Sequence, residues 1–118
     1  MNTKNKKIIK NTKKSSAMHF LDKIAGSELN FSNMLVSIRE SEEISQIQFA
    51  KTLGISRQNL CDIEKGRKGI SPARAASFAG ILGYSEEVFV MLALQDKVDR
   101  DGLKLRVFIR SATMSTLT

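Results

Sequence analysis

Apolar residues from residue 31 onward recur at intervals of three and four, the period of a helix that buries one face. The clearest case is the set Phe31, Met34, Leu35 and Ile38, which falls at i, i+3, i+4 and i+7. This set predicts a first helix that ends near Glu42. The core of the chain is therefore expected to be all-α.

Two further short helices are predicted to meet at Gly54. The first begins after Ser45, which has the spacing of a capping box, and runs to Leu53. Gly54 then supplies the left-handed conformation that ends a helix. The next helix has Ser56 as its cap and ends at Gly66, so this part of the chain has the layout of a helix-turn-helix.

A fourth and a fifth helix follow, each with its own start signal. Ser71 is followed by Pro72, which is favoured at the first helical position, and this helix is expected to reach about Leu82. Ser85 opens the fifth helix, which is expected to reach about Asp99. The sequence thus predicts a compact domain of five helices over residues 17–101.

The pattern changes after residue 101 to the alternation of a β-strand. Four apolar residues alternate with four others, of which three are basic: Leu103, Lys104, Leu105, Arg106, Val107, Phe108, Ile109 and Arg110. A lone strand leaves backbone groups unpaired along both edges. The predicted strand, within a tail of residues 102–118, either packs against the helices or pairs with a second copy or another protein.

The charge of the chain is uneven. Residues 1–14 hold six lysines and no acid, and with residues 15 and 16 they are expected to form a flexible basic arm. A short helix is predicted over residues 17–25. Residues 51–74 hold six basic and two acidic residues, whereas residues 86–101 hold five acidic and two basic ones. This separation would orient the domain on a polyanion such as DNA.

Several functional classes are disfavoured. Cys61 is the single cysteine, which excludes an internal disulfide and fits a reducing cytoplasm. His19 is the single histidine, so neither a metal site nor a catalytic relay can be built around it. No apolar run approaches the ~20 residues needed to cross a bilayer. We therefore expect no enzyme activity, no cofactor, no metal and no membrane partner.

The residues of the predicted helix-turn-helix meet its steric demands together. Ala50 is small where the two helices cross, and Gly54 tolerates a positive φ. Leu60 and Ile63 are apolar, as needed to pack the second helix of the motif onto its neighbours. At this spacing from Gln46 the whole set is a specific signal, whereas a single alanine or glycine would be weak.

With these residues the chain resembles the lambda-repressor-like family, also called Xre or Cro/CI-type helix-turn-helix proteins. The matching residues are Gln46, Ala50, Leu53, Gly54, Ile55, Ser56, Leu60, Ile63, Glu64, Gly66, Arg67 and Lys68. The resemblance covers about residues 31–95 and implies a five-helix domain that binds operator DNA, usually as a dimer. Residues 56–87 with the strand-like tail also resemble the small HigA-like antitoxins of this family.

The resemblance places base-reading residues on the first turn and outward face of the third helix: Ser56, Arg57, Gln58 and Asp62. Arg57 suits guanine and Gln58 suits adenine in the major groove. Asp62 is unusual there. It could accept a hydrogen bond from cytosine, but pairing with Arg57 or Lys65 is the favoured interpretation.

The same resemblance assigns phosphate contacts to five residues: Gln46, Asn59, Lys65, Arg67 and Lys68. The expected function is that of a sequence-specific repressor that binds a palindromic operator as a homodimer. The small size favours an antitoxin of a type II toxin–antitoxin pair that regulates its own operon. The alternative is a free-standing phage-type or chromosomal repressor without a toxin partner.

Overall fold

The computed structural model describes residues 29–112. The predicted basic arm of residues 1–16, the predicted helix of residues 17–25 and the last six residues of the tail lie outside the described residues. Within the described range the chain forms five α-helices and no strand. The predicted all-α fold is confirmed.

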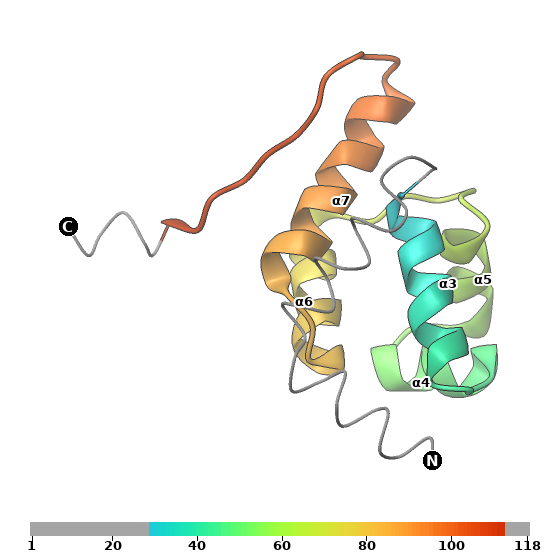
Figure 1. Cartoon of the computed structure of the whole chain (residues 1–118). Helices are drawn as coiled ribbons and strands as arrows, with labels where there is room; N and C mark the ends of the chain where they lie inside the picture. The colour runs from blue at the N-terminus through green and yellow to red at the C-terminus, as the bar shows by residue number, and fades with distance from the viewer. Residues whose placement is uncertain (1–28, 113–118) are drawn as a thin grey trace.

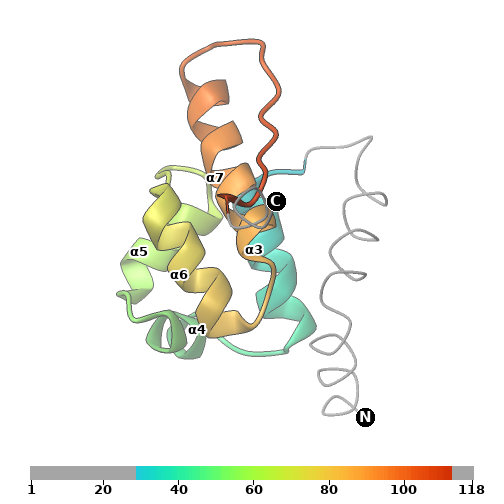
Figure 2. The ribbon, with the colours of Figure 1, turned by 90° about the vertical axis from the view of Figure 1, so that its left-hand side faces the viewer.

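The five helices are joined by short connections (Figure 1). Their bounds are α3 Phe31–Ser41, α4 Gln46–Leu53, α5 Arg57–Glu64, α6 Pro72–Leu82 and α7 Glu86–Arg100. All five lie where the sequence places them, within a few residues at each end. In both Figure 1 and Figure 2, α5 lies at one edge of the helical body, so one of its faces is open.

Each helix starts with a side-chain cap. The oxygen of the capping residue accepts a hydrogen bond from the backbone N–H three residues later, as between Ser45 and Gln48 or Ser56 and Asn59. The full set of caps is Asn30, Ser45, Ser56, Ser71 and Ser85. One cap of this kind contributes about 1 kcal/mol, so the starts of these short helices are fixed locally.

The core lies between α3 and the other helices. Phe31, Met34, Leu35 and Ile38 are 0–7% exposed, which confirms the buried face predicted for α3. The ring of Phe31 meets that of Phe89 on α7 edge-on, with centroids 5.7 Å apart. This contact joins α3 and α7, the first and last helices within residues 29–112, around one apolar centre.

The strand predicted over residues 103–110 is not seen. The described part of the chain offers no strand to pair with, and the segment instead runs extended away from α7 (Figure 1). Gln95, a buried residue of α7, bonds to this segment. Its Nε2 donates to the Leu105 carbonyl at 2.8 Å, and its Oε1 accepts from the Val107 N–H at 2.7 Å. A side-chain amide of α7 thus binds one edge of the segment, which agrees with the predicted alternative in which the segment packs against the helices.

Candidate nucleic-acid interface

The α4–turn–α5 unit has the geometry that its sequence predicts. Gly54 ends α4 with φ at 75°, and the Ile55 N–H bonds to the Ala50 carbonyl at 3.0 Å. Ala50 is 2% exposed, and Leu60 and Ile63 are 0% and 4% exposed. Because Leu60 and Ile63 face inward, the residues of the first turn of α5 and of the side opposite these two form its outer face.

That outer face carries the residues expected to read bases. Ser56, Arg57 and Gln58 are exposed at the first turn of α5, and Asp62 lies partly buried one turn later. Ser56 has a second task, because its oxygen accepts from the Asn59 N–H at 3.0 Å. Its hydroxyl proton remains free to donate to a ligand.

A buried carboxylate ties α5 to the two preceding helices. The side chain of Glu64 is 4% exposed. Its carboxylate accepts hydrogen bonds from Arg39 of α3, from Nε to Oε2 at 2.8 Å and from Nη2 to Oε1 at 3.2 Å. Gln46 at the start of α4 donates its Nε2 to Glu64 Oε1 at 2.9 Å. These contacts fix the angle of α5 relative to α3 and α4.

Gln46 also binds Arg57 and so links its position to that of Glu64. The Oε1 atom of Gln46 accepts from Arg57 Nη1 at 3.4 Å, so one amide joins the buried carboxylate to an exposed arginine. Among the described residues, no acid forms an ion pair with Arg57. Gln46 therefore orients the guanidinium of Arg57 through Nη1, and its other N–H groups can still donate to an acceptor on a ligand.

Asp62 forms its ion pair with Arg67, and not with Arg57 or Lys65 as the sequence had favoured. Arg67 donates to Asp62 Oδ1 at 2.9 Å and 3.1 Å. The reason is the turn after α5, where Gly66 has φ at 74° and brings the Arg67 N–H to the Asp62 carbonyl at 2.9 Å. The hydrogen bond from Arg67 is the main cause that lowers the pKa of Asp62, and the bond from Gln58 adds to it.

Asp62 also orients Gln58. The Gln58 Nε2 atom donates to Asp62 Oδ1 at 3.1 Å. Since an amide nitrogen carries two protons, Gln58 keeps one donor and its carbonyl oxygen for a base edge. This is the donor and acceptor set that adenine requires in the major groove.

The residues expected to contact phosphate lie at the start of α4 and along or after α5. Gln46 lies at the start of α4, where its side chain is bound to Glu64 and Arg57. The others lie after or along α5, and Lys68 Nζ donates to Asn59 Oδ1 at 2.7 Å. Lys65, Arg67 and Lys68 are exposed. The structure thus groups the expected site residues around α5.

Sequence reasoning missed Arg39 and the structural role of Glu64. Glu64 follows the buried Ile63 directly and lies one helical turn after the buried Leu60. Arg39 in turn follows the buried Ile38. Opposite charges at the borders of two apolar helix faces were the signal in the sequence for this pair.

Other kinds of site find less support. The described residues contain no cluster of histidine, cysteine and acidic side chains that could hold a metal. No helix within residues 29–112 is long and apolar enough to cross a membrane. Cys61 is a free thiol on α5, with Sγ 3.7 Å from Arg67 Nη2.

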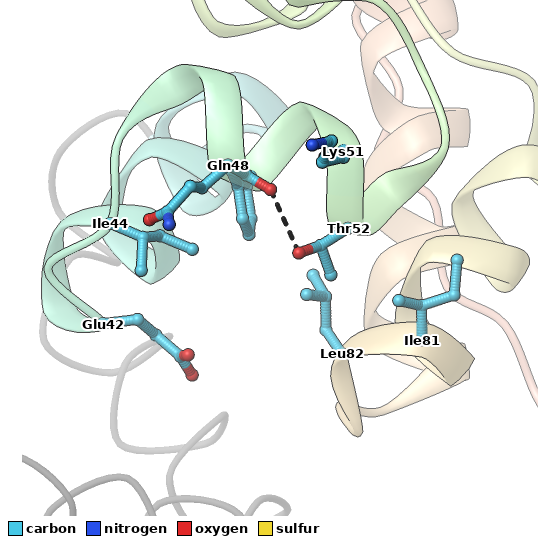
Figure 3. Close-up of a pocket in the computed structure, with 8 residues that line it drawn as sticks. Glu42, Ile44, Gln48, Lys51, Thr52, Ile81 and Leu82 are labelled. Atoms are coloured by element: carbon cyan, nitrogen blue, oxygen red, sulfur yellow. Dashed lines mark hydrogen bonds between the residues drawn. The ribbon is translucent and has the colours of Figure 1, made fainter.

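A separate hollow of about 490 Å³ lies between α4 and α6. Figure 3 shows Ile81 and Leu82 on one side and Ile44 on the other, with the Thr52 hydroxyl donating to the Gln48 carbonyl at 3.1 Å. None of the residues expected to contact DNA lines this hollow. It is therefore distinct from the face formed by α5.

Comparison with known proteins agrees with this geometry. Residues 35–89 match the protein-family model described as helix-turn-helix, and the matched segment runs from α3 into α7. No curated protein and no solved structure matches the chain.

Proposed function

From the premise that this chain belongs, through residues 35–89, to the lambda-repressor-like helix-turn-helix family of DNA-binding transcriptional regulators, we propose that it represses one operator and neutralises a toxin. The operator is read by α5, and the toxin is encoded in the same operon. The chain then regulates that operon as a type II antitoxin does.

The outer face of α5 supports the sequence-specific part of this proposal. Arg57 binds guanine through two donors and Gln58 binds adenine, while Ser56 and Asp62 contact adjacent bases. Each bidentate contact gives about 1–3 kcal/mol of discrimination. The observation that carries the proposal is the hydrogen-bonded chain from Glu64 through Gln46 to Arg57. An arginine side chain that is already oriented in the free protein loses less conformational entropy when it binds a base.

Gln46, Asn59, Lys65, Arg67 and Lys68 contact the phosphates on either side. These contacts add affinity and fix the register of α5, but they carry no sequence choice. The chain binds as a homodimer to a palindrome whose half-sites lie about one helical turn apart.

The antitoxin role is supported by apolar surface away from α5. Ile81 is 48% exposed beside the hollow between α4 and α6, and none of the proposed DNA contacts lies there. A toxin bound at Ile81 leaves the recognition face open, which an autoregulatory complex requires. A free-standing repressor, the second candidate, needs no such surface.

Co-expression with the neighbouring reading frame tests the antitoxin role. The full chain is expected to restore growth that the neighbouring product arrests, and Ile81→Asp is expected to lose this rescue. The matched variant Arg57→Ala is expected to rescue growth while losing operator repression. A neighbouring product that does not arrest growth, or rescue that survives Ile81→Asp, contradicts this toxin-binding proposal, and a harmless neighbour favours the free-standing repressor.

A further inference from the structure

We propose that residues 103–110 form an antiparallel two-stranded ribbon with the same residues of a second copy, with Val107 opposite Val107. The inference rests on the proposed dimer and names its surface. It starts from the extended segment that runs away from α7 in Figure 1, on the side of the molecule away from α5 in Figure 1 and Figure 2.

The first observation is that one edge of this segment is already occupied. In an extended chain the backbone groups of alternate residues point to opposite edges. The Leu105 carbonyl and the Val107 N–H both point to Gln95 of α7, at 2.8 Å and 2.7 Å. The two central groups of the edge formed by the odd-numbered residues are therefore already bonded within the chain.

The second observation is that the opposite edge is open. The backbone groups of Lys104, Arg106 and Phe108 point away from Gln95, and none forms a hydrogen bond to another described residue. All three residues are exposed. An extended segment with unpaired backbone groups is a template for another strand.

Exposed apolar side chains flank this edge. Leu105 is 63% exposed and Phe108 is 81% exposed, and they lie on opposite faces of the extended segment. Leu103, at 50%, lies on the same face as Leu105. A second strand covers side chains on both faces at once, whereas packing against one flat surface covers only one face.

The sequence of the segment selects a second copy in one register. With Val107 opposite Val107, Leu105 faces Ile109 and the apolar face is continuous across both strands. On the other face Arg106 meets Phe108 of the second copy twice, a cation–π pairing. Only the Lys104–Arg110 pairs at the two ends bring like charges together, and their long side chains can diverge into solvent.

Other registers of the ribbon are less stable because they place like charges opposite each other. Centring the ribbon on Arg106 places two arginines directly opposite each other, which is destabilising. Centring it on Phe108 pairs Arg106 with Arg110 twice. The register centred on Val107 also uses the open edge, since Arg106 and Phe108 then become a hydrogen-bonded pair.

The ribbon closes at two strands. In each copy Gln95 of α7 lies against the outer edge, where the Leu105 carbonyl and the Val107 N–H are already bonded, so a third strand cannot pair with these two central groups. The contact is therefore a closed two-fold dimer and not the start of a fibre. Because the segment lies away from α5, the recognition helices stay uncovered.

Disulfide trapping of the full chain tests the surface and its register. In a Cys61→Ser background, Val107→Cys places two thiols across a non-hydrogen-bonded pair with Cα atoms about 4.5 Å apart, which a disulfide can bridge. Arg106→Cys is the matched control, because its Cα atoms are diagonal neighbours about 7–8 Å apart. We expect most of the Val107→Cys protein, and little of the Arg106→Cys protein, to run as a covalent dimer after mild oxidation.

Sedimentation equilibrium completes the test. Arg106→Pro removes an N–H of the open edge and is expected to raise the dimer dissociation constant at least tenfold, with an unchanged helical circular dichroism signal. A monomeric parent chain, a trapped Arg106→Cys dimer, or a dimer that resists Val107→Cys trapping overturns the inference. Sequence-specific DNA binding by α5 is measured separately, so the failure of either proposal is recognised without the other.

Discussion

The guanidinium of Arg39 on α3 donates to the carboxylate of Glu64 on α5 at 2.8 Å, although 25 residues separate them. This pair fixes α5 against α3 on the side opposite its exposed face. Glu64 in turn holds Gln46, and Gln46 holds Arg57. A buried contact thereby sets the position of an exposed side chain that is proposed to read DNA.

Glu64→Ala is expected to lower the free energy of unfolding by about 3 kcal/mol, because it leaves the partly buried guanidinium of Arg39 without a carboxylate and with only the Ile44 carbonyl, at 3.2 Å, as an acceptor. Urea unfolding followed by circular dichroism measures this loss. Glu40→Ala on the exposed side of α3 is the control and should change stability by less than about 0.5 kcal/mol. Equal effects of the two substitutions would show that the pair has no special structural role.

Asp62 is expected to titrate below its usual pKa of 3.8, mainly because Arg67 donates to its carboxylate. A lowered pKa in the folded state stabilises the fold at pH values above the unfolded pKa, and this stabilisation is lost as the pH falls through the folded value. A carboxyl NMR titration should show the pKa of Asp62 rising in Arg67→Ala and staying in place in Lys65→Ala. A shift caused by Lys65→Ala alone would argue for the partner first predicted.

Two glycine substitutions should have opposite effects on stability. Gly54 has φ at 75° with open space where a Cβ would lie, so Gly54→Ala is expected to cost about 1 kcal/mol through backbone strain alone. Gly80 lies within α6 with the same open space, and Gly80→Ala should stabilise by about 0.5–1 kcal/mol. Chemical unfolding of both variants checks the sign, and a stabilising Gly54→Ala would refute the assigned turn.

Lys68→Ala is expected to weaken binding to all duplexes by a similar factor and to reduce the slope of log K against log salt by about 0.9, the value for one phosphate contact. Fluorescence anisotropy at several salt concentrations gives the slope. Lys97→Ala on α7, where the lysine pairs with Asp101, serves as the control and should leave the slope unchanged. An unaltered slope in Lys68→Ala would remove this residue from the interface.

The helices could be predicted from the sequence because their signals are local. Ser45, Ser56 and Gly54 act on backbone groups within a few residues, and the apolar positions of α3 need only the helical period. The partner of Asp62 could not be predicted in this way. It depends on the path of the chain after Gly66, which returns Arg67 to the end of α5.

The segment after α7 illustrates a different limit. Its alternating pattern indicated a strand, and the backbone is indeed extended, but the described chain provides no neighbouring strand. The groups that bind it belong to the side chain of Gln95, in the middle of a helix. A side-chain amide that replaces a strand edge leaves no periodic signal in the sequence.

The most direct test of base reading by α5 compares Arg57→Lys with the parent chain on two duplexes, an operator obtained by selection and a random sequence. Lysine keeps the charge but replaces the rigid planar fork of arginine with a single ammonium group, so the two separate donor nitrogens for guanine O6 and N7 are lost. We predict a loss of about 1–3 kcal/mol on the operator, roughly 5- to 150-fold in affinity, and almost none on the random duplex. Equal losses on both duplexes would contradict the account.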